Sequence, residues 1–465
     1  MPATRITCPP ALPATRLLLV GLVGLALAAP LCPQHARAMG TDGNQVLPKA
    51  GHPSLESPHV SPILALNGRV FVTNTPAGTV DVITPGRGVT RRVQVGVDPV
   101  SLAARPDGKE IWVSNHVSDS VSVIDTDPDS PSFLRVVATL QDLDHARAVT
   151  RFDEPAGIAF ADCAKAYVAL SSSNQIAVVD VASRKVTGRI AIPAQEPRAI
   201  AVAAGRLFVL PFESGNQTQL SGGVGAKDGD LVTFDAYEHS IRVNNVLSIG
   251  HVTDIVRNPA VPDRDLFLFR TSDDSLDRVV SSLGTLLYGL AVDGQGNAFI
   301  TQTEARNDAN GRAGSKKHGL RELGNRPFLN RVTMVPANGD KPRTIELEPL
   351  PPQNPAPGEA LATPFGLQVL DNGMLVGTAA GSDLLFTLDP ASQKVLGRVT
   401  VGAGPRGVTI ANAPGQPARA WVYNALDNSV EEVDLSRPES PRALGRVALE
   451  DPTHPASKRG RIAFN

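Results

Sequence analysis

One short pattern recurs along most of the chain. Its clearest copy is the run Ile111–Asn115, a polar turn, and the run Ser120–Asp125, with apolar and polar residues alternating on both sides of the turn. Alternation with a period of two around a short polar connection is typical of a β-hairpin. From Asp125 onward, matching hairpins end at intervals of 45 to 55 residues, at Asp125, Asp180, Asp235, Val280, Val335, Asp389 and Asp434, and Ile83 ends an earlier copy. We count eight repeats.

Each repeat holds about four short strands whose connections are too short for a parallel crossover, so each favours an antiparallel meander. A small four-stranded sheet cannot bury both faces alone, but sheets that pack face to face around an axis can. The sequence therefore predicts an all-β fold, a β-propeller of four-stranded blades over residues 61–449. Eight blades form if every repeat makes one. Seven is the alternative, because the repeat at 266–280 is irregular.

The composition supports a folded chain that is rich in turns. Gly (41) and Pro (39) are frequent among the 465 residues, and an apolar fraction of 42% is enough for a buried core. The formal net charge of −2 does not suggest nucleic-acid binding. We therefore expect no nucleic-acid partner.

The first 38 residues have the organisation of a secretory signal peptide. Basic residues precede the apolar run Leu17–Ala29, and Ala36–Ala38 provides small residues at the −3 and −1 positions of a cleavage site. The apolar run is too short to span a bilayer comfortably. We predict a soluble periplasmic or secreted protein with no transmembrane span after cleavage, and residues 39–60 as a linker. A lipoprotein anchored through Cys32 and an uncleaved N-terminal anchor are the alternatives.

Removal of this segment takes away two of the three cysteines and leaves Cys163 alone. The mature chain is then expected to have no internal disulfide. Cys163 precedes a strand-like run, so we expect a buried small thiol at this position.

Three hairpins carry the strings Val72-Thr73-Asn74, Trp112-Val113-Ser114-Asn115 and Trp421-Val422-Tyr423-Asn424, each before a polar turn and an alternating strand. Short pairs ending in proline open the innermost strands: Asp98-Pro99, Glu154-Pro155, Glu196-Pro197 and Gly404-Pro405. These features resemble the YVTN family of bacterial β-propeller repeats. The resemblance covers about residues 61–449 and implies the propeller fold. It implies little about function, since such propellers serve as binding platforms, surface proteins and parts of redox enzymes.

The tail, residues 450–465, ends in Gly460-Arg461-Ile462-Ala463-Phe464-Asn465. It resembles the junction at which YVTN propellers run into a domain similar to di-haem cytochrome c peroxidases. The resemblance implies a protein partner of the c-type cytochrome class. The sequence contains no Cys-x-x-Cys-His motif, so we predict no cofactor in this chain. The tail is either the start of a truncated cytochrome-like domain or an ordinary polar extension.

The innermost strands of a propeller begin at the mouth of its central channel. Charged and aromatic residues occupy the matching positions here: Asp98, Glu154, Glu196, Arg198, Asp254, Tyr288, Phe365 and Arg406. Carboxylates and guanidinium groups that converge on one cavity could bind a small polar ligand or a metal. The alternative is that they line a wet channel and pair with one another. Of these we select Asp98, Glu154, Glu196, Arg198, Tyr288 and Arg406 as candidate ligand-binding residues.

A basic insertion between residues 303 and 329 is the second candidate site. Its cations are Arg306, Arg312, Lys316, Lys317, Arg321 and Arg326. A long basic loop on a slightly acidic chain could dock an acidic partner by electrostatic steering. The alternative is a solvated loop that packs Phe328 and Leu329 over a blade.

Motifs for catalysis or metal binding are missing from the sequence. Asp125, Asp127 and Asp129 alternate, but they lack the glycine and the terminal glutamate of a Ca²⁺-binding loop. The histidines have no ligand spacing, and there is no Gly-x-Ser-x-Gly elbow or phosphate loop. We predict no catalytic residues and no metal site.

Two functions fit these observations. The first is an exported, non-catalytic propeller that acts as a binding scaffold, for example the propeller half of a periplasmic redox system. The second is a propeller enzyme of the lactonase or quinone-dependent dehydrogenase type that uses the channel mouth. Pairing of the mouth carboxylates with arginines, in the absence of a cavity, would exclude the second.

Overall fold

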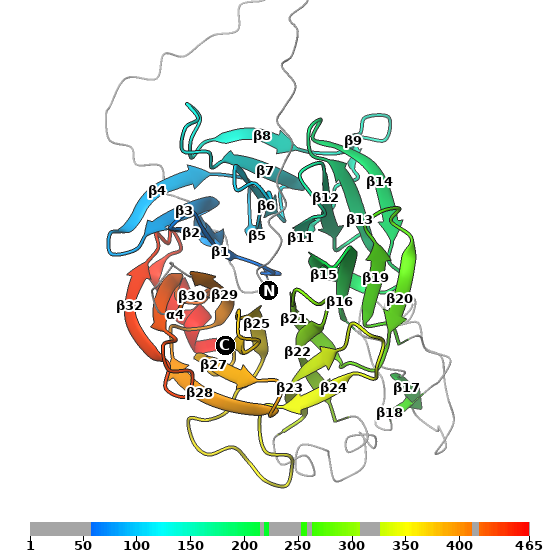
Figure 1. Cartoon of the computed structure of the whole chain (residues 1–465), viewed down its shortest axis with the longest axis vertical. Helices are drawn as coiled ribbons and strands as arrows, with labels where there is room; N and C mark the ends of the chain where they lie inside the picture. The colour runs from blue at the N-terminus through cyan, green and yellow to red at the C-terminus, as the bar shows by residue number, and fades with distance from the viewer. Residues whose placement is uncertain are drawn as a thin grey trace, which may run out of the picture.

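The computed structural model describes residues 57–213, 218–222, 253–257, 263–306, 326–411 and 418–464. Its strands form four-stranded antiparallel sheets arranged as a ring, with the first strand of each sheet near the axis and the fourth at the rim (Figure 1). This is a β-propeller, so the all-β prediction is confirmed. The segment predicted as a signal peptide and most of the predicted linker lie outside the described residues.

Seven blades can be followed through the described residues. Blades 1 to 3 are β1–β4 (Ile63–Leu66, Arg69–Asn74, Thr79–Thr84, Gly88–Gln94), β5–β8 (Pro99–Ala104, Glu110–Asn115, Ser120–Asp125, Val136–Leu140) and β11–β14 (Pro155–Phe160, Lys165–Leu170, Gln175–Asp180, Lys185–Ala191). Blade 4 consists of β15 (Gln195–Ala203), β16 (Arg206–Glu213), β19 (Leu266–Arg270) and β20 (Leu276–Val280).

Blades 5 to 7 are β21–β24 (Leu286–Val292, Ala298–Ala305, Phe328–Val335, Arg343–Glu346), β25–β28 (Pro364–Val369, Leu375–Ala379, Leu384–Asp389, Lys394–Thr400) and β29–β32 (Pro405–Ala411, Arg419–Asn424, Ser429–Asp434, Arg442–Ala448). A short hairpin of β9 (Leu143–Asp144) and β10 (Val149–Thr150) lies between blades 2 and 3. The 3-10 turn η1 (Thr75–Ala77) follows β2, and the helix α4 (Pro455–Phe464) follows blade 7.

The count of eight repeats is one too many for the described residues, because two partial repeats build one blade. The first supplies the inner strands β15 and β16, and the second supplies the outer strands β19 and β20. Between them, β17 (Thr218–Gly222) and β18 (Thr253–Arg257) pair with each other and with no blade strand. The irregular repeat at 266–280 is thus the outer half of blade 4, and the seven-blade alternative is correct.

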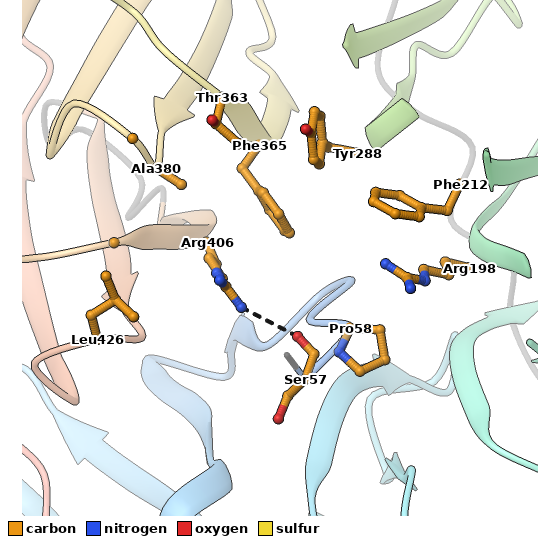
Figure 2. Close-up of a pocket in the computed structure, with 12 residues that line it drawn as sticks. Ser57, Pro58, Arg198, Phe212, Tyr288, Thr363, Phe365, Ala380, Arg406 and Leu426 are labelled. Carbon is orange, nitrogen blue, oxygen red and sulfur yellow. Dashed lines mark hydrogen bonds between the residues drawn. The ribbon is translucent and has the colours of Figure 1, made fainter. Parts of the chain in front are cut away.

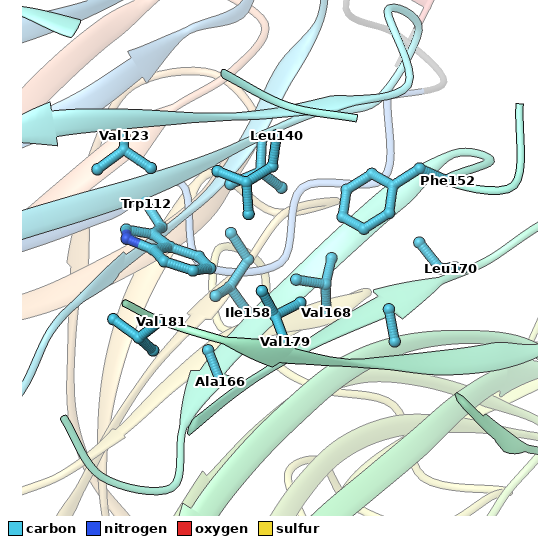
Figure 3. Packing of buried hydrophobic residues seen from close by; sticks show 12 residues of the cluster. Trp112, Val123, Leu140, Phe152, Ile158, Ala166, Val168, Leu170, Val179 and Val181 are labelled. Carbon is cyan, nitrogen blue, oxygen red and sulfur yellow. The ribbon is translucent and has the colours of Figure 1, made fainter. Parts of the chain in front are cut away.

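The hydrophobic core is divided among the interfaces between neighbouring blades. Seven clusters of buried apolar residues each join two adjacent blades, including the cluster between blades 7 and 1. Figure 3 shows the cluster between blades 2 and 3, in which Trp112 and Phe152 are completely buried. Trp112 also meets Phe160 edge to face, with 5.2 Å between ring centroids. Each sheet therefore buries both faces, as the repeated alternation requires.

The ring closes without strand exchange, because blade 1 and blade 7 each take all four strands from one end of the chain. Side chains connect them instead. The Asn428 side chain donates to Asn74 Oδ1 at 3.0 Å, and the Asn74 side chain donates to the carbonyl of Glu450 at 2.8 Å. The backbone N–H of Ala65 donates to Thr409 Oγ1 at 3.1 Å.

The helix α4 follows the last blade, and Figure 1 shows it in the region of blade 7. Its Arg461 is 4% exposed and donates to the carbonyl of Leu426 at 2.8 Å and to Asp451 Oδ2 at 2.7 Å. This buried arginine attaches the helix to the turn between β30 and β31. Among the described residues, no helix has the length and apolar character needed to cross a membrane.

Cys163 differs from its prediction. It is half-buried and disulfide-bonded in the full-length chain, and its partner lies outside the described residues. The expectation of a buried free thiol is therefore wrong for the full-length chain.

Candidate binding site at the channel mouth

Six of the seven innermost strands carry a β-bulge near their start, after the first residue in four blades, after Leu287 in β21 and after Pro197 in β15. The residue that begins each bulge has no partner in the register of the neighbouring strand. In blades 2 to 7 these residues are Val100, Ala156, Arg198, Tyr288, Phe365 and Arg406. A bulge redirects a side chain out of the regular pleat. Its repetition therefore places one redirected side chain per blade at the mouth of the channel.

The proline pairs seen in the sequence belong to the turn that precedes this bulge. The residue before proline has a positive φ in five blades: Asp98 (58°), Glu154 (48°), Glu196 (54°), Thr363 (51°) and Gly404 (62°). In four of these blades its carbonyl accepts a hydrogen bond from the turn between the second and third strands, from the N–H of His116, Ser171, Ala380 and Ala425 at 2.9 to 3.1 Å. The acidic residues in these pairs thus occupy a turn position whose backbone conformation is repeated from blade to blade.

A cavity of about 350 Å³ opens where the bulged residues of blades 4 to 7 meet. Figure 2 shows Arg198, Tyr288, Phe365 and Arg406 around it, together with Phe212 from the end of β16. Further lining comes from Ser57 and Pro58 at the N-terminal end of the described chain, from the small residues Ala380, Gly381 and Gly404, and from Thr363 and Leu426.

Three aromatic rings form a continuous wall of the cavity, which we call the aromatic arc: Phe212, Tyr288 and Phe365. The ring centroids of Phe212 and Tyr288 are 5.6 Å apart, and those of Tyr288 and Phe365 are 5.3 Å apart. A guanidinium group lies at each end of the arc. The Arg198 Cζ is 3.8 Å from the centroid of Phe212, and the Arg406 Cζ is 5.6 Å from that of Phe365. Cations favour such positions over aromatic rings.

The surroundings of the two arginines disfavour their positive charge. Burial lowers the pKa of Arg406, and the positive charge of Arg198 lowers it further. Burial also lowers the pKa of Arg198, although nearby glutamates, with Glu196 first among them, oppose this. Both side chains remain cationic at neutral pH, since guanidinium groups do not deprotonate in proteins. The cavity is therefore bordered by two positive charges, of which that of Arg198 is partly offset by Glu196.

Hydrogen bonds hold each guanidinium in place. Arg198 forms an ion pair with Glu196. Its buried Nε has no hydrogen-bond partner among the described residues. Arg406 donates to the carbonyl of Ser57 at 3.3 Å (Figure 2).

The mouth carboxylates do not converge as the sequence suggested. Asp98 is 2% exposed and accepts a hydrogen bond from Ser57 Oγ at 2.7 Å. Glu154 is exposed, with Oε2 3.9 Å from His116 Nε2. Glu196 pairs with Arg198, and none of these three residues lines the cavity. Asp254 belongs to β18, outside the blades, so its assignment to an innermost strand is wrong. The structure instead brings together Arg198, Tyr288, Phe365 and Arg406.

Sequence reasoning missed Phe212, Ser57 and Pro58. Phe212 is close to the end of β16, where the long insertion begins, and this position was its only signal. Ser57 and Pro58 are buried although they belong to the segment predicted as a linker. His59 beside them is 2% exposed, and its Nε2 is 2.9 Å from Thr75 Oγ1. Burial and the charge of Arg406 hold the pKa of His59 well below its usual value.

Only the two ends of the basic insertion are described. Arg306 donates to the carbonyl of Arg326 at 3.0 Å. Arg326 donates to Glu348 Oε2 at 2.9 Å and to the carbonyls of Pro349 and Gln353 at 2.8 Å. This arginine fastens the base of the insertion to the connection between blades 5 and 6. Arg312, Lys316, Lys317 and Arg321 lie outside the described residues, and a docking function for the insertion stays a prediction.

Within the described ranges, no three His, Cys, Asp or Glu residues are grouped so that they could hold a metal ion.

Solved β-propellers resemble this chain in fold. A hydrazine synthase structure from Kuenenia stuttgartiensis aligns over 85% of this chain and 98% of its own, with a TM-score of 0.56 and 19% identity. A virginiamycin B lyase from Staphylococcus aureus aligns over 79% and 92%, with a TM-score of 0.47 and 11% identity. A streptogramin B lyase aligns over 80% and 92%, with a TM-score of 0.49 and 10% identity. At these identities the likeness concerns the fold alone.

No family model matches the chain, and a search of curated proteins finds no match. The resemblance to YVTN repeats and to a cytochrome junction therefore stays a prediction.

Proposed function

We propose that this protein is a binding propeller that holds a small organic anion in the cavity at its channel mouth. One observation carries the proposal: Arg198 of blade 4 and Arg406 of blade 7 come from opposite sides of the cavity and both line it. The scaffold function predicted from the sequence is kept, but the ligand is assigned to the arginines and the aromatic arc instead of the carboxylates.

Charge in a partly buried space supports this assignment. Two like charges that face one cavity repel each other more strongly than they would in water, because the effective dielectric constant is lower. An anion between them removes this repulsion and gains charge-assisted hydrogen bonds from both guanidinium groups. The cavity volume of about 350 Å³ is also in the range of small-molecule sites.

We also propose that the protein is exported, with residues 1–38 acting as a cleaved signal peptide. Expression of the full chain in a Gram-negative bacterium should release a mature protein into the periplasm. Its N-terminal sequence is expected to begin at Met39. Retention of Met1 on protein in the cytoplasm would contradict export.

Binding can be tested by isothermal titration calorimetry on the full chain at low ionic strength. Benzoate, cyclohexanecarboxylate, acetate and inorganic phosphate are suitable probes. We expect at least one of these anions to bind the wild type, and the double variant Arg198→Gln/Arg406→Gln to bind it at least about tenfold more weakly, because hydrogen bonds to charged groups contribute about 1.5 to 3 kcal/mol each.

The matched control is Arg442→Gln. Arg442 lies on the outer strand β32, is 74% exposed at its side chain and pairs loosely with Asp434 at 3.6 Å. Its replacement should leave binding unchanged. The proposal is wrong if no probe binds the wild type, or if the double variant, folded as judged by circular dichroism, binds as tightly as the wild type.

A further inference from the structure

We infer that the anion is a flat aromatic carboxylate, whose carboxylate lies between Arg198 and Arg406 and whose ring packs on the aromatic arc. This inference rests on the proposed function and adds to it the chemical class of the ligand.

The order of side chains around the cavity defines an amphipathic ligand. A cation, three aromatic rings and a second cation follow one another around the cavity, and each contacts the next at the distances given above. In order they are Arg198, Phe212, Tyr288, Phe365 and Arg406. These residues come from four successive blades, so the arc is curved around one space. A molecule that satisfies the whole arc needs a charged end for the arginines and an apolar body for the rings.

The charged end fits a carboxylate better than a phosphate. A carboxylate has two oxygens, and a guanidinium group offers a planar fork of N–H donors that matches them. A phosphate brings more oxygens and more charge, and each oxygen without a donor in a partly apolar cavity has a desolvation cost. The aromatic and small residues that make up most of the remaining wall provide few such donors.

The apolar body fits a flat ring. Phe212, Tyr288 and Phe365 are half-buried, so each keeps surface that a ligand can cover. The Phe365 ring points into the space between Arg406 and Phe212 (Figure 2). Ala380, Gly381 and Gly404 add almost no side-chain bulk to the wall. Aromatic rings prefer to meet other rings edge to face or in offset stacks, which gives a flat ring an advantage over a saturated one.

The N-terminal segment prepares the charged end of the site. The carbonyl of Ser57 accepts one N–H of Arg406 at 3.3 Å, and Ser57 itself is held by Asp98 at 2.7 Å. The guanidinium group is thereby oriented before a ligand arrives. Prior orientation of this kind reduces the entropy lost on binding.

The experiment is a set of calorimetric titrations of the full chain at pH 7 and low ionic strength. The probes are benzoate, cyclohexanecarboxylate, acetate, inorganic phosphate and the neutral benzamide. We expect benzoate to bind about tenfold or more tightly than acetate, phosphate or benzamide, because acetate and phosphate lack the ring and benzamide lacks the charge. Cyclohexanecarboxylate should bind between benzoate and acetate.

Two variants separate the ring contact from the charge contact. Phe365→Leu should reduce the preference for benzoate over acetate by about threefold or more, because it replaces a ring by an aliphatic side chain of similar volume. Arg406→Gln should weaken both carboxylates together. Phe328→Leu is the matched control, because Phe328 is 44% exposed and outside the cavity, and it should change neither value.

The outcomes distinguish the two proposals. If acetate or phosphate binds as tightly as benzoate in an arginine-dependent manner, the aromatic carboxylate is wrong and the anion site stands. If benzamide binds as tightly as benzoate, or if no anion binds, both proposals are wrong. A benzoate preference that survives Phe365→Leu unchanged also overturns the assignment of the ring to the aromatic arc.

Discussion

The innermost strands of blades 2 and 3 have the same bulge in their backbone as those of blades 4 to 7, but they carry different side chains at that bulge. Val100 and Ala156 are small, apolar and buried, whereas Arg198, Tyr288, Phe365 and Arg406 are large and face a cavity. The repeat thus supplies the same redirected position in each of these blades. Function can then be placed on one part of the ring by side-chain choice alone, without a change of fold.

The small residues on the other side have a structural consequence. The N–H of Val60 donates to the carbonyl of Val100 at 3.1 Å, and the N–H of Leu102 donates to the carbonyl of Ser61 at 2.8 Å. The chain that enters the ring therefore runs beside β5, next to the bulge at Val100. The same segment reaches the cavity on the other side, where Ser57 and Pro58 form part of its wall.

The largest expected effect is a loss of stability when an aromatic residue of the core is replaced, and it contrasts with replacement of a residue of the aromatic arc. Trp112 is fully buried between blades 2 and 3. Trp112→Ala should lower the free energy of unfolding by about 3 to 5 kcal/mol through lost packing and a cavity. Urea unfolding followed by circular dichroism measures this. Phe365→Ala, which truncates a half-buried ring at the mouth, should cost clearly less. Equal losses would mean that the arc is part of the core.

The next prediction gives blade 7 the residue that blade 2 carries. Arg406→Val should weaken benzoate binding by about 10- to 100-fold, because a charge-assisted contact is lost. The free energy of unfolding should change little, since the variant also removes one of two like charges from the cavity. Calorimetry and urea unfolding report the two quantities separately. A large loss of stability with unchanged affinity would assign Arg406 to structure instead of binding.

A pH-dependent effect is expected at the helix that supports the cavity wall. Arg461 holds the carbonyl of Leu426, a cavity residue, and pairs with Asp451. Burial raises the pKa of Asp451, but hydrogen bonds from Thr453 and Arg461 outweigh it and lower the pKa overall. A carboxyl group whose pKa is lowered by folding stabilises the fold above its unfolded pKa, about 3.9, and loses that contribution as the pH falls through the folded pKa.

Asp451→Asn should therefore lower the free energy of unfolding by about 1 to 2 kcal/mol at pH 7. The difference from the wild type should stay constant down to about pH 5 and shrink below about pH 4. Unfolding curves at several pH values test this. A difference that grows on acidification would contradict the sign of the shift.

The smallest effect is expected where a carboxylate occupies a turn position only. Glu154 has a φ of 48°, a left-handed conformation that glycine adopts more easily. Glu154→Gly should change the free energy of unfolding by less than about 1 kcal/mol and leave binding unchanged. Glu196→Gly removes the ion-pair partner of Arg198 and should alter the affinity for benzoate. Identical affinities for the two variants would show that the ion pair does not influence the site.

Several features of the molecule follow from local sequence. The alternation in Ile111–Asn115 and Ser120–Asp125 predicts the hairpin of β6 and β7, because successive side chains of a strand point to opposite faces of the sheet. The proline pairs correctly indicate the start of the innermost strands. The sequence also predicted that Arg198, Tyr288 and Arg406 lie at the mouth, since each is close to the start of an innermost strand.

The sequence by itself determined the repeated four-stranded unit, and with it the propeller, because alternation and turn residues act over a few neighbouring positions. Only the tertiary structure decided the number of blades, since β16 pairs with β19 across a long insertion that no local pattern reveals. It also decided the site. The bulge directs Arg198 and Arg406 into one cavity, while Asp98 and Glu154 share their strand position and do not line it. Side-chain direction depends on register and on neighbouring blades, and these are properties of the closed ring.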